Sequence, residues 1–278
     1  MKTIKVAAPA KINLTLEVLN KREDGFHNIK SIMQAISLYD YLTFTVEESD
    51  KNVIILSGNS DKIPYNEKNL VYKALNAFFE ESGIVGQKVS CYIEKNIPVE
   101  AGLAGGSTDG AAALFAMNKL FGYVLSEETV DKICASLGSD LNFCLQGGRA
   151  YCTGRGENIK KISFDKCDVC LIKPLGFGIS AKEAYTKFAS LSDKSVPNNT
   201  EKMIDKFDSA LLYNSLENAV IDDYKELREI KVNVVGSMMS GSGPTFFALK
   251  KNVGYAFDSD RFLTIENLEF IEDGVKEI

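Results

Sequence analysis

A chain of 278 residues with 45% apolar, 25% charged and 10% aromatic residues has the composition of a globular protein. That composition excludes a disordered chain, a collagen-like repeat and a small disulfide-stapled scaffold. The length predicts two domains or one large one. With 32 basic against 38 acidic residues the formal net charge is −6, so we expect neither a nucleic-acid partner nor an anionic membrane partner.

The cysteines and the apolar runs indicate the compartment. Cys167 and Cys170 have the spacing of a metal or redox pair, but no second such pair and no neighbouring histidine accompanies them. They lie in a strand-like run, where an offset of three residues sends side chains to opposite faces. We therefore expect all six cysteines to be packing thiols. No signal-peptide pattern opens the chain, and no apolar run approaches the ~20 residues of a membrane span, which predicts a cytoplasmic protein.

The first half of the chain reads as strands followed by a helix. From Lys11 apolar and polar residues alternate, which predicts a strand with Lys11 and Asn13 on one polar face. A polar loop follows at 21–25. Helical spacing of apolar residues predicts a helix over 70–81 that ends at Gly83. Further strands are expected at 41–46, 53–56 and 89–93.

A glycine-rich loop, Pro98–Thr108, stands between the last of these strands and an Ala-rich helix over 111–121. Its glycines let main-chain N–H groups approach a ligand, and the unpaired amides of a helix that begins near Ser107 would favour a phosphate. The loop is neither a Walker A loop nor a dinucleotide fingerprint, because the lysine and the glycine spacing are absent. A tight strand–helix turn capped by a serine explains the same residues.

The second half mixes both kinds of element. A helix over 127–137 ends at Gly138, just before Asp140, and the segment 147–156 looks like the approach to a domain boundary. Strands are then expected at 169–172, 232–235 and 245–249, and helices at 181–191, 202–212 and 222–230. This order predicts an α+β fold. The small residues of the segment 240–245 suggest a close approach to a ligand or to the first glycine-rich loop.

Taken one at a time, the polar candidates have ordinary explanations. A single lysine such as Lys11 is usually a solvated surface residue, and Asp140 has the position of a helix cap. His27, the only histidine, has the pKa of a general base, but a lone histidine in a polar loop more often makes structural or binding hydrogen bonds.

Three segments together resemble the GHMP kinases, the superfamily of galactokinase and of homoserine, mevalonate and phosphomevalonate kinases. Pro9–Leu14, Pro98–Asp109 and Met239–Thr245 are similar to its three motifs and stand in the same order. Within the superfamily, Arg22–His27 and Gly138–Phe143 resemble the kinases that phosphorylate the 2-hydroxyl of CDP-methylerythritol (4-diphosphocytidyl-2-C-methyl-D-erythritol) in the non-mevalonate isoprenoid pathway.

The resemblance implies two domains, which we place at residues 1–157 and 158–278. The first would resemble the ribosomal S5 domain 2-like fold and bind ATP, and the second would be ferredoxin-like. Lys11 and Asp140 correspond to the catalytic pair, and Ser107 is the candidate for contact with Mg²⁺. Asn13, Phe26, His27 and Tyr185 correspond to substrate contacts, with Phe26 and Tyr185 on the two faces of cytosine. The implied ATP-binding residues are Pro98, Val99, Glu100, Ala101, Gly102, Leu103, Ala104, Gly105, Gly106, Ser107, Thr108, Asn69 and Leu70.

The implied activity is ATP- and Mg²⁺-dependent phosphoryl transfer to a small-molecule alcohol, by a monomer or a weak homodimer. Two alternatives remain open from the sequence. One is another small-molecule kinase of the superfamily, of the homoserine or mevalonate-pathway type, although the segment 24–27 favours a cytidine nucleotide. The other is a nucleotide-binding module that keeps the fold without catalysing transfer.

Overall fold

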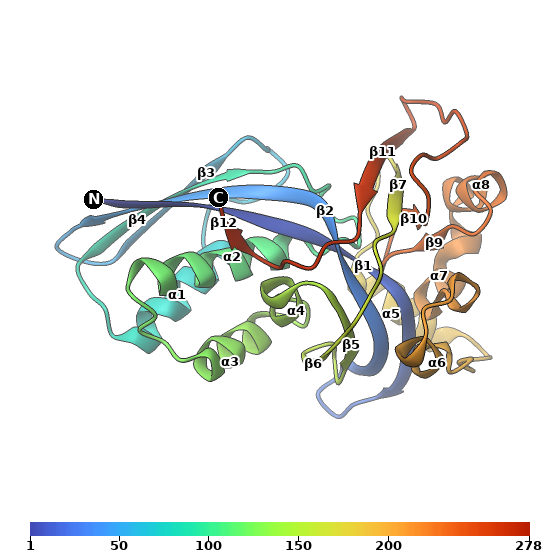
Figure 1. The fold of residues 1–278 in the computed structure, drawn as a ribbon, viewed down its shortest axis with the longest axis horizontal. Coiled ribbons are helices and arrows are strands. Elements are labelled where there is room, and N and C mark those ends of the chain that lie inside the picture. Colours follow the sequence, from blue (N-terminus) through green and yellow to red (C-terminus); the bar gives the residue numbers. More distant parts are fainter.

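The computed structural model describes residues 1–278, which form two β-sheets flanked by helices (Figure 1). The first sheet has eight strands, with the order β12-β1-β2-β4-β3 along its main path; β5 pairs with β2 and with β6, and β8 pairs with β1. Its strands are β1 (Lys2–Lys21), β2 (His27–Glu48), β3 (Val53–Gly58), β4 (Gln87–Glu94), β5 (Arg149–Thr153), β6 (Asn158–Ile162), β8 (Tyr213–Asn214) and β12 (Lys276–Glu277).

The second sheet has four strands in the order β11-β7-β10-β9. These are β7 (Asp168–Pro174), β9 (Met238–Met239), β10 (Phe246–Ala248) and β11 (Phe262–Glu269). The α+β prediction is confirmed. The chain does not keep to one sheet in each half, because β12 returns at the C-terminus to pair with β1 beside the N-terminus (Figure 1).

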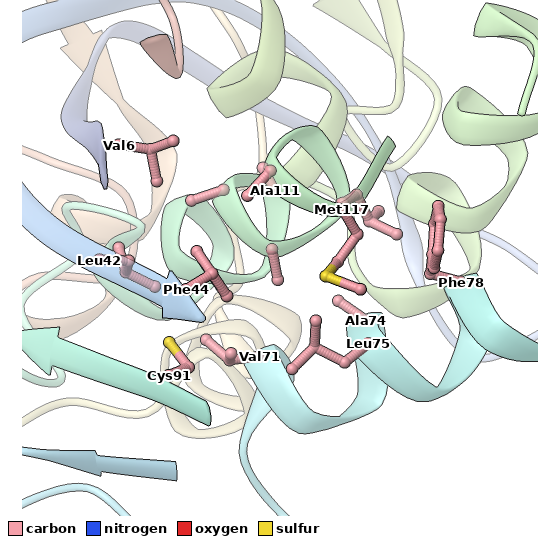
Figure 2. Packing of buried hydrophobic residues seen from close by; sticks show 14 of the residues in the cluster. Val6, Leu42, Phe44, Val71, Ala74, Leu75, Phe78, Cys91, Ala111 and Met117 are labelled. Carbon is pink, nitrogen blue, oxygen red and sulfur yellow. The ribbon is translucent and has the colours of Figure 1, made fainter. Parts of the chain in front are cut away.

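Four helices cover one face of the first sheet: α1 (Leu70–Ser82), α2 (Gly105–Leu120), α3 (Glu127–Leu137) and α4 (Leu141–Gln146). Figure 2 shows Phe44 of β2 and Cys91 of β4 pointing toward Val71 and Leu75 of α1 and Met117 of α2. The predicted helix over 70–81 and its end at Gly83 are confirmed, since Asn69 caps the first turn and Gly83 adopts a left-handed conformation after the last.

The remaining helices pack against the second sheet or over the far ends of β1 and β2: α5 (Ala181–Ser190), α6 (Asn199–Asp205), α7 (Ser215–Val220) and α8 (Lys225–Asn233). The predicted strand at 232–235 is wrong, because its first two residues end α8. Leu227, Ile230 and Val234 follow helical spacing and are fully buried, so packing overrides the β preference of valine. The predicted helix at 202–212 is wrong beyond Asp205, where the chain leaves the helix before a single 3₁₀ turn at Ser209–Leu211.

Both faces of β7 are buried, and this explains the cysteine pair. Cys170 belongs to a buried cluster with residues of α5, α7 and α8, whereas Cys167 packs against a different cluster that includes Leu171 and Phe247. All six cysteines are free thiols and five are fully buried, as the sequence predicts. None of the helices is both long enough and apolar enough to cross a membrane.

Candidate active site

Lys11 and Asp140 come from distant parts of the chain and meet at one point. Lys11 lies on β1, Asp140 lies in the turn between α3 and α4, and the Lys11 Nζ is 3.4 Å from the Asp140 Oδ2. The reading of Lys11 as a solvated surface residue is wrong, since the residue is only 4% exposed. Asp140 precedes α4 but makes no side-chain capping hydrogen bond, so its carboxylate is available to a ligand.

The Lys11 ammonium is buried because other elements cover the polar face of β1. This face carries the predicted row of Lys11, Asn13, Thr15 and Glu17, and all four residues are shielded from solvent. The Lys11 Nζ donates a 2.7 Å hydrogen bond to the Asn13 Oδ1. The Lys11 side chain is thus held by a carboxylate and an amide oxygen at the edge of the site, where an acceptor oxygen could contact it.

The pair borders a cavity of about 760 Å³. Its wall includes the polar side chains of Asn13 and Ser107, and three further cations, Lys21, Arg155 and Lys182. Against these, Asp140 is the single carboxylate in the lining. This local excess of positive charge, in a protein whose net charge is negative, would attract an anionic ligand to the cavity.

Aromatic rings form another part of the same cavity. His27, at the start of β2, stacks on Tyr185 of α5 with the ring centroids 5.4 Å apart and the planes 20° apart. Phe26 also lines the cavity and is 53% exposed, with the Arg155 guanidinium 5.1 Å from its ring centroid. Phe26 therefore offers an open ring face to a planar ligand, whereas the structure pairs Tyr185 with His27.

His27 is suited to binding rather than to acid–base chemistry. Burial, and then the charges of Lys21 and Lys194, lower the pKa of the imidazole below its ordinary 6.5. The ring is therefore neutral at pH 7, able to donate one hydrogen bond and accept another.

The glycine-rich loop leads directly into α2, which begins at Gly105 rather than near Ser107. Ala104 precedes it with φ 59°, and no side chain caps the helix. The first hydrogen bond of the helix runs from the Thr108 N–H to the Ala104 carbonyl, so the N–H groups of Gly105, Gly106 and Ser107 have no intrahelical acceptor. These three amides, together with the helix dipole, are an anion-binding group, and the alternative of a serine-capped turn is wrong.

A second cavity of about 310 Å³ lies on the other side of the loop. Gly102 and Ala104 border both cavities, which makes the loop the wall between them. The predicted residues Asn69 and Leu70 line the smaller cavity, as do Pro98, Val99, Glu100, Ala101, Leu103, Gly105 and Gly106. Thr108 lines neither cavity, because its side chain is fully buried beneath the helix.

The second glycine-rich segment touches the first. The Ser240 Oγ donates a 2.9 Å hydrogen bond to the Gly102 carbonyl, and a Cβ at Gly102 would lie 2.0 Å from the Ser240 carbonyl oxygen. Gly102 has φ +72°, a conformation that favours glycine. The structure therefore shows the predicted approach of the segment 240–245 to the first loop, and Gly241 and Ser242 of the same segment also line the larger cavity.

Several groups near the cavities were not found from the sequence. The Lys95 Nζ lies between the carboxylates of Asp40 and Asp109, 2.7 Å from the Asp109 Oδ2, and all three side chains are at least 96% buried. Lys95 and Asp109 border the smaller cavity. Arg155 lines the larger cavity and lies between Gly154 and Gly156, in the segment that the sequence predicts as the approach to a domain boundary. This Gly-Arg-Gly sequence is the one local signal for Arg155, and the sequence around Asp40 carries none.

No cluster of three or more His, Cys, Asp or Glu side chains is placed to hold a metal ion. Mg²⁺ commonly uses one or two protein groups and takes its other ligands from phosphates and water. Two such groups line the larger cavity, the Ser107 hydroxyl in the first turn of α2 and the Asp140 carboxylate. They fit a Mg²⁺ that is already bound to a nucleotide.

Comparisons with known proteins agree on one family. Residues 69–148 match the model for the N-terminal domain of GHMP kinases. The chain is 41% identical over 260 residues to a Clostridium acetobutylicum protein named 4-diphosphocytidyl-2-C-methyl-D-erythritol kinase, covering 89% of this chain and 91% of that one. A Clostridioides difficile protein of the same name is 41% identical over 270 residues, covering 91% and 88%.

Solved structures show the same fold. A crystal structure of 4-(cytidine 5'-diphospho)-2C-methyl-D-erythritol kinase superposes with a TM-score of 0.71 at 29% identity, covering 89% of this chain and 90% of that one. A homoserine kinase from Cytophaga hutchinsonii superposes with a TM-score of 0.79 at 19% identity, covering 100% and 98%. At that identity the second likeness concerns the fold alone.

Proposed function

The chain belongs to the 4-diphosphocytidyl-2-C-methyl-D-erythritol kinases of the GHMP superfamily, and from this premise we infer that it transfers the γ-phosphoryl group of ATP to the 2-hydroxyl of CDP-methylerythritol. The predicted family and its kinase activity are confirmed by the relatives. The observation that carries the assignment of the site is the meeting of Lys11 and Asp140 beside the free amides of α2.

We place the two substrates in the two cavities. ATP would occupy the smaller one, with its adenine toward Asn69 and Leu70 and its phosphates on the amides of Gly105, Gly106 and Ser107. CDP-methylerythritol would occupy the larger one, which is wide enough for a nucleoside diphosphate. Because Gly102 and Ala104 border both cavities, the γ-phosphate and the acceptor hydroxyl would meet where the loop separates them.

The aromatic and cationic lining suits the cytidine diphosphate part of this substrate. The open face of Phe26 would stack on the base, and His27 would supply hydrogen bonds to its edge. Tyr185, stacked on His27, would hold that imidazole in place and complete the aromatic wall. Lys21, Arg155 and Lys182 would offset the charge of the diphosphate.

In the transfer itself, Asp140 would accept the proton of the attacking hydroxyl, and Lys11 would stabilise negative charge on the acceptor oxygen. Their separation of 3.4 Å lets one hydroxyl contact both groups. Phosphoryl transfer needs alignment and charge stabilisation more than covalent help, which is what this arrangement offers. Mg²⁺ bound to the triphosphate would neutralise phosphate charge, with the Ser107 hydroxyl as the protein contact.

We propose a monomer or a weak homodimer, because one chain supplies a residue for every role assigned above. We also propose the cytoplasm as the location, because the reaction consumes ATP. The domain boundary at 157/158 remains a prediction; it falls between β5 and β6, which pair with each other.

The test is a coupled ADP-release assay with ATP, Mg²⁺ and a panel of alcohols: CDP-methylerythritol, homoserine, mevalonate and galactose. We expect turnover with CDP-methylerythritol alone, and none from Asp140→Ala under the same conditions. Turnover with another alcohol instead would contradict the substrate assignment. ATP binding without turnover of any alcohol would favour a nucleotide-binding module.

A further inference from the structure

A chain of buried side chains lies behind the Lys11–Asp140 pair: it begins at Asn13, which lines the larger cavity, and continues inward to Ser31. Asn13 is 1% exposed and Ser31, on β2, is fully buried. The Asn13 Nδ2 donates a 2.8 Å hydrogen bond to the Ser31 Oγ, and the Ser31 Oγ donates a 2.6 Å hydrogen bond to the Thr15 carbonyl. Ser31 borders neither of the two cavities, so it cannot touch either substrate.

The direction of this chain is fixed by what each group can donate. A lysine ammonium has no acceptor, so the Asn13 amide must turn its oxygen toward Lys11 and its NH₂ toward Ser31. The Ser31 Oγ must then accept a hydrogen bond from Asn13 and donate its own hydrogen bond to another acceptor. That acceptor is the Thr15 carbonyl, which lies where the pairing of β1 with β2 shifts register between Asn13 and Thr15.

We propose that Ser31 is a positioning residue for the phosphoryl transfer: it fixes the orientation of the Asn13 amide, and through it the position of the Lys11 ammonium. The proposal rests on the role given to Lys11 under Proposed function. Without the Ser31 hydroxyl the Asn13 NH₂ loses its acceptor, and only the attraction of the ammonium for the amide oxygen still favours the native one of the two amide orientations. In the reversed one an NH₂ group faces the ammonium, and Lys11 moves away from both Asn13 and the acceptor oxygen.

Ser31→Ala tests the proposal because it removes only the hydroxyl from a fully buried site. Misplacement of a charge-stabilising group by a fraction of an ångström to 1 Å lowers kcat by about 10-fold to 100-fold. We expect a loss in that range, with the KM for ATP unchanged because Ser31 does not line the smaller cavity. Ser237→Ala is the matched control: its hydroxyl is also buried but has no hydrogen-bond partner, and its loss should leave kcat unchanged.

A double-mutant cycle separates positioning from a general weakening of the sheet. The carboxylate of Asn13→Asp presents an oxygen to Lys11 in either orientation, so the contact between residue 13 and Lys11 no longer depends on Ser31. On that background Ser31→Ala should change kcat by less than about twofold. An equal loss on both backgrounds would show a merely structural role, and wild-type kcat in Ser31→Ala would overturn the proposal.

A crystal structure of Ser31→Ala distinguishes failure of this proposal from failure of the proposed function, since it needs no activity. We expect the Lys11 Nζ to have left the 2.7 Å contact with residue 13. If wild type phosphorylates an alcohol other than CDP-methylerythritol, the substrate assignment fails, but the cycle applies to that reaction unchanged. An undisturbed Lys11 in the variant would overturn the positioning role whatever the substrate.

Discussion

Two charged side chains dominate the site at the scale of single residues. Lys11 is almost fully buried, whereas the Asp140 side chain is 28% exposed and faces the larger cavity. The two members of this pair differ in exposure: the Lys11 ammonium is surrounded by protein groups, whereas the Asp140 carboxylate can be contacted by the hydroxyl of a substrate. This asymmetry agrees with the roles proposed above, charge stabilisation for Lys11 and proton acceptance for Asp140.

Lys11→Ala and Asp140→Ala should each lower kcat by at least about 100-fold, the scale of losing one charge-stabilising or acid–base group. Asp140→Asn should be nearly as damaging, because an amide cannot accept the proton. Steady-state kinetics with both substrates is the measurement. Near-normal turnover in either alanine variant would remove that residue from the mechanism.

Arg155 lines the larger cavity and not the smaller one. Its guanidinium lies over the Phe26 ring and its Nη2 donates a 2.9 Å hydrogen bond to the Ala135 carbonyl. Arg155→Ala should raise the KM for CDP-methylerythritol about 10-fold, equivalent to ~1.4 kcal/mol, and leave the KM for ATP unchanged. Lys132→Ala on the exposed face of α3 is the control, and equal changes in both KM values would contradict this role.

At the scale of elements, one buried ion cluster holds the two ends of the glycine-rich loop before α2. Lys95 precedes the loop, Asp109 follows it in α2, and the two side chains pair at 2.7 Å. Asp40 of β2 pairs with the same ammonium and also accepts hydrogen bonds from the N–H groups of Asn96 and Ile97. The loop is thus closed at its base by charges excluded from water, which keeps the amides of α2 aimed at the cavity.

This cluster predicts a pH dependence of stability. Burial, with a smaller contribution from the neighbouring Asp40 carboxylate, raises the pKa of Asp109 from 3.8 to about 7, and the ion pair with Lys95 offsets the rise only in part. The native state therefore binds this proton more tightly than the unfolded state. The resulting stability is fully present below about pH 4 and is lost as the pH rises toward 7.

Asp109→Asn removes the titrating group, and urea denaturation from pH 4 to 8 measures the effect. The unfolding free energy of wild type minus that of the variant should fall between pH 4 and 7 and then level off. Glu128→Gln is the control, because its hydrogen bond to Lys132 lowers the pKa of that exposed carboxylate below 4.5. Its difference should be flat over pH 5 to 7, and a flat difference for Asp109→Asn would contradict the raised pKa.

Local pattern predicts helix α1, which buries one face, and it fails for the first half of β2, which buries two. Helix α1 was predictable because Val71, Leu75 and Phe78 repeat at helical spacing over one core. The first half of β2 was missed because residues on both of its faces, such as Ile32 and Met33, are buried, so nothing alternates. The two-residue strand β12 has no pattern to read.

The site divides in the same way. The motifs that resemble the family contain Lys11, Ser107 and Asp140, and the structure brings all three to one cavity. Asp40 and Lys95 are 55 residues apart, and Ser31 and Asn13 are 18 apart, with no local sequence signal for either contact. Buried polar partners are chosen by the packing of whole strands, which a single sequence does not display.

At the scale of the whole molecule, the site lies where the two sheets meet. The loop before α2 belongs to the first sheet, and Ser240 follows β9 of the second. Asn214 strengthens the junction, because its Nδ2 donates hydrogen bonds to the carbonyls of Met239 and Gly241, at 2.7 and 2.9 Å. A change in how the sheets meet must therefore move the wall between the two cavities.

Gly102→Ala tests this dependence at the point of closest approach. The new Cβ would lie 2.0 Å from the Ser240 carbonyl oxygen, in a left-handed conformation that alanine disfavours, so the segment 240–243 must move. We expect the unfolding free energy to fall by at least about 2 kcal/mol. Because Gly102 borders both cavities, the KM values for ATP and for CDP-methylerythritol should rise together.

Gly106→Ala is the matched control for stability, since it adds the same methyl group to the same loop–helix junction. Its Cβ would have only Leu70 Cδ1 nearby, at 3.8 Å, and its backbone is helical, where alanine is preferred over glycine. Urea denaturation should therefore show Gly106→Ala at or above the wild-type stability. If Gly102→Ala unfolds at the same urea concentration as this control, the contact between the two sheets does not hold the wall in place, and the site must be organised by the first sheet alone.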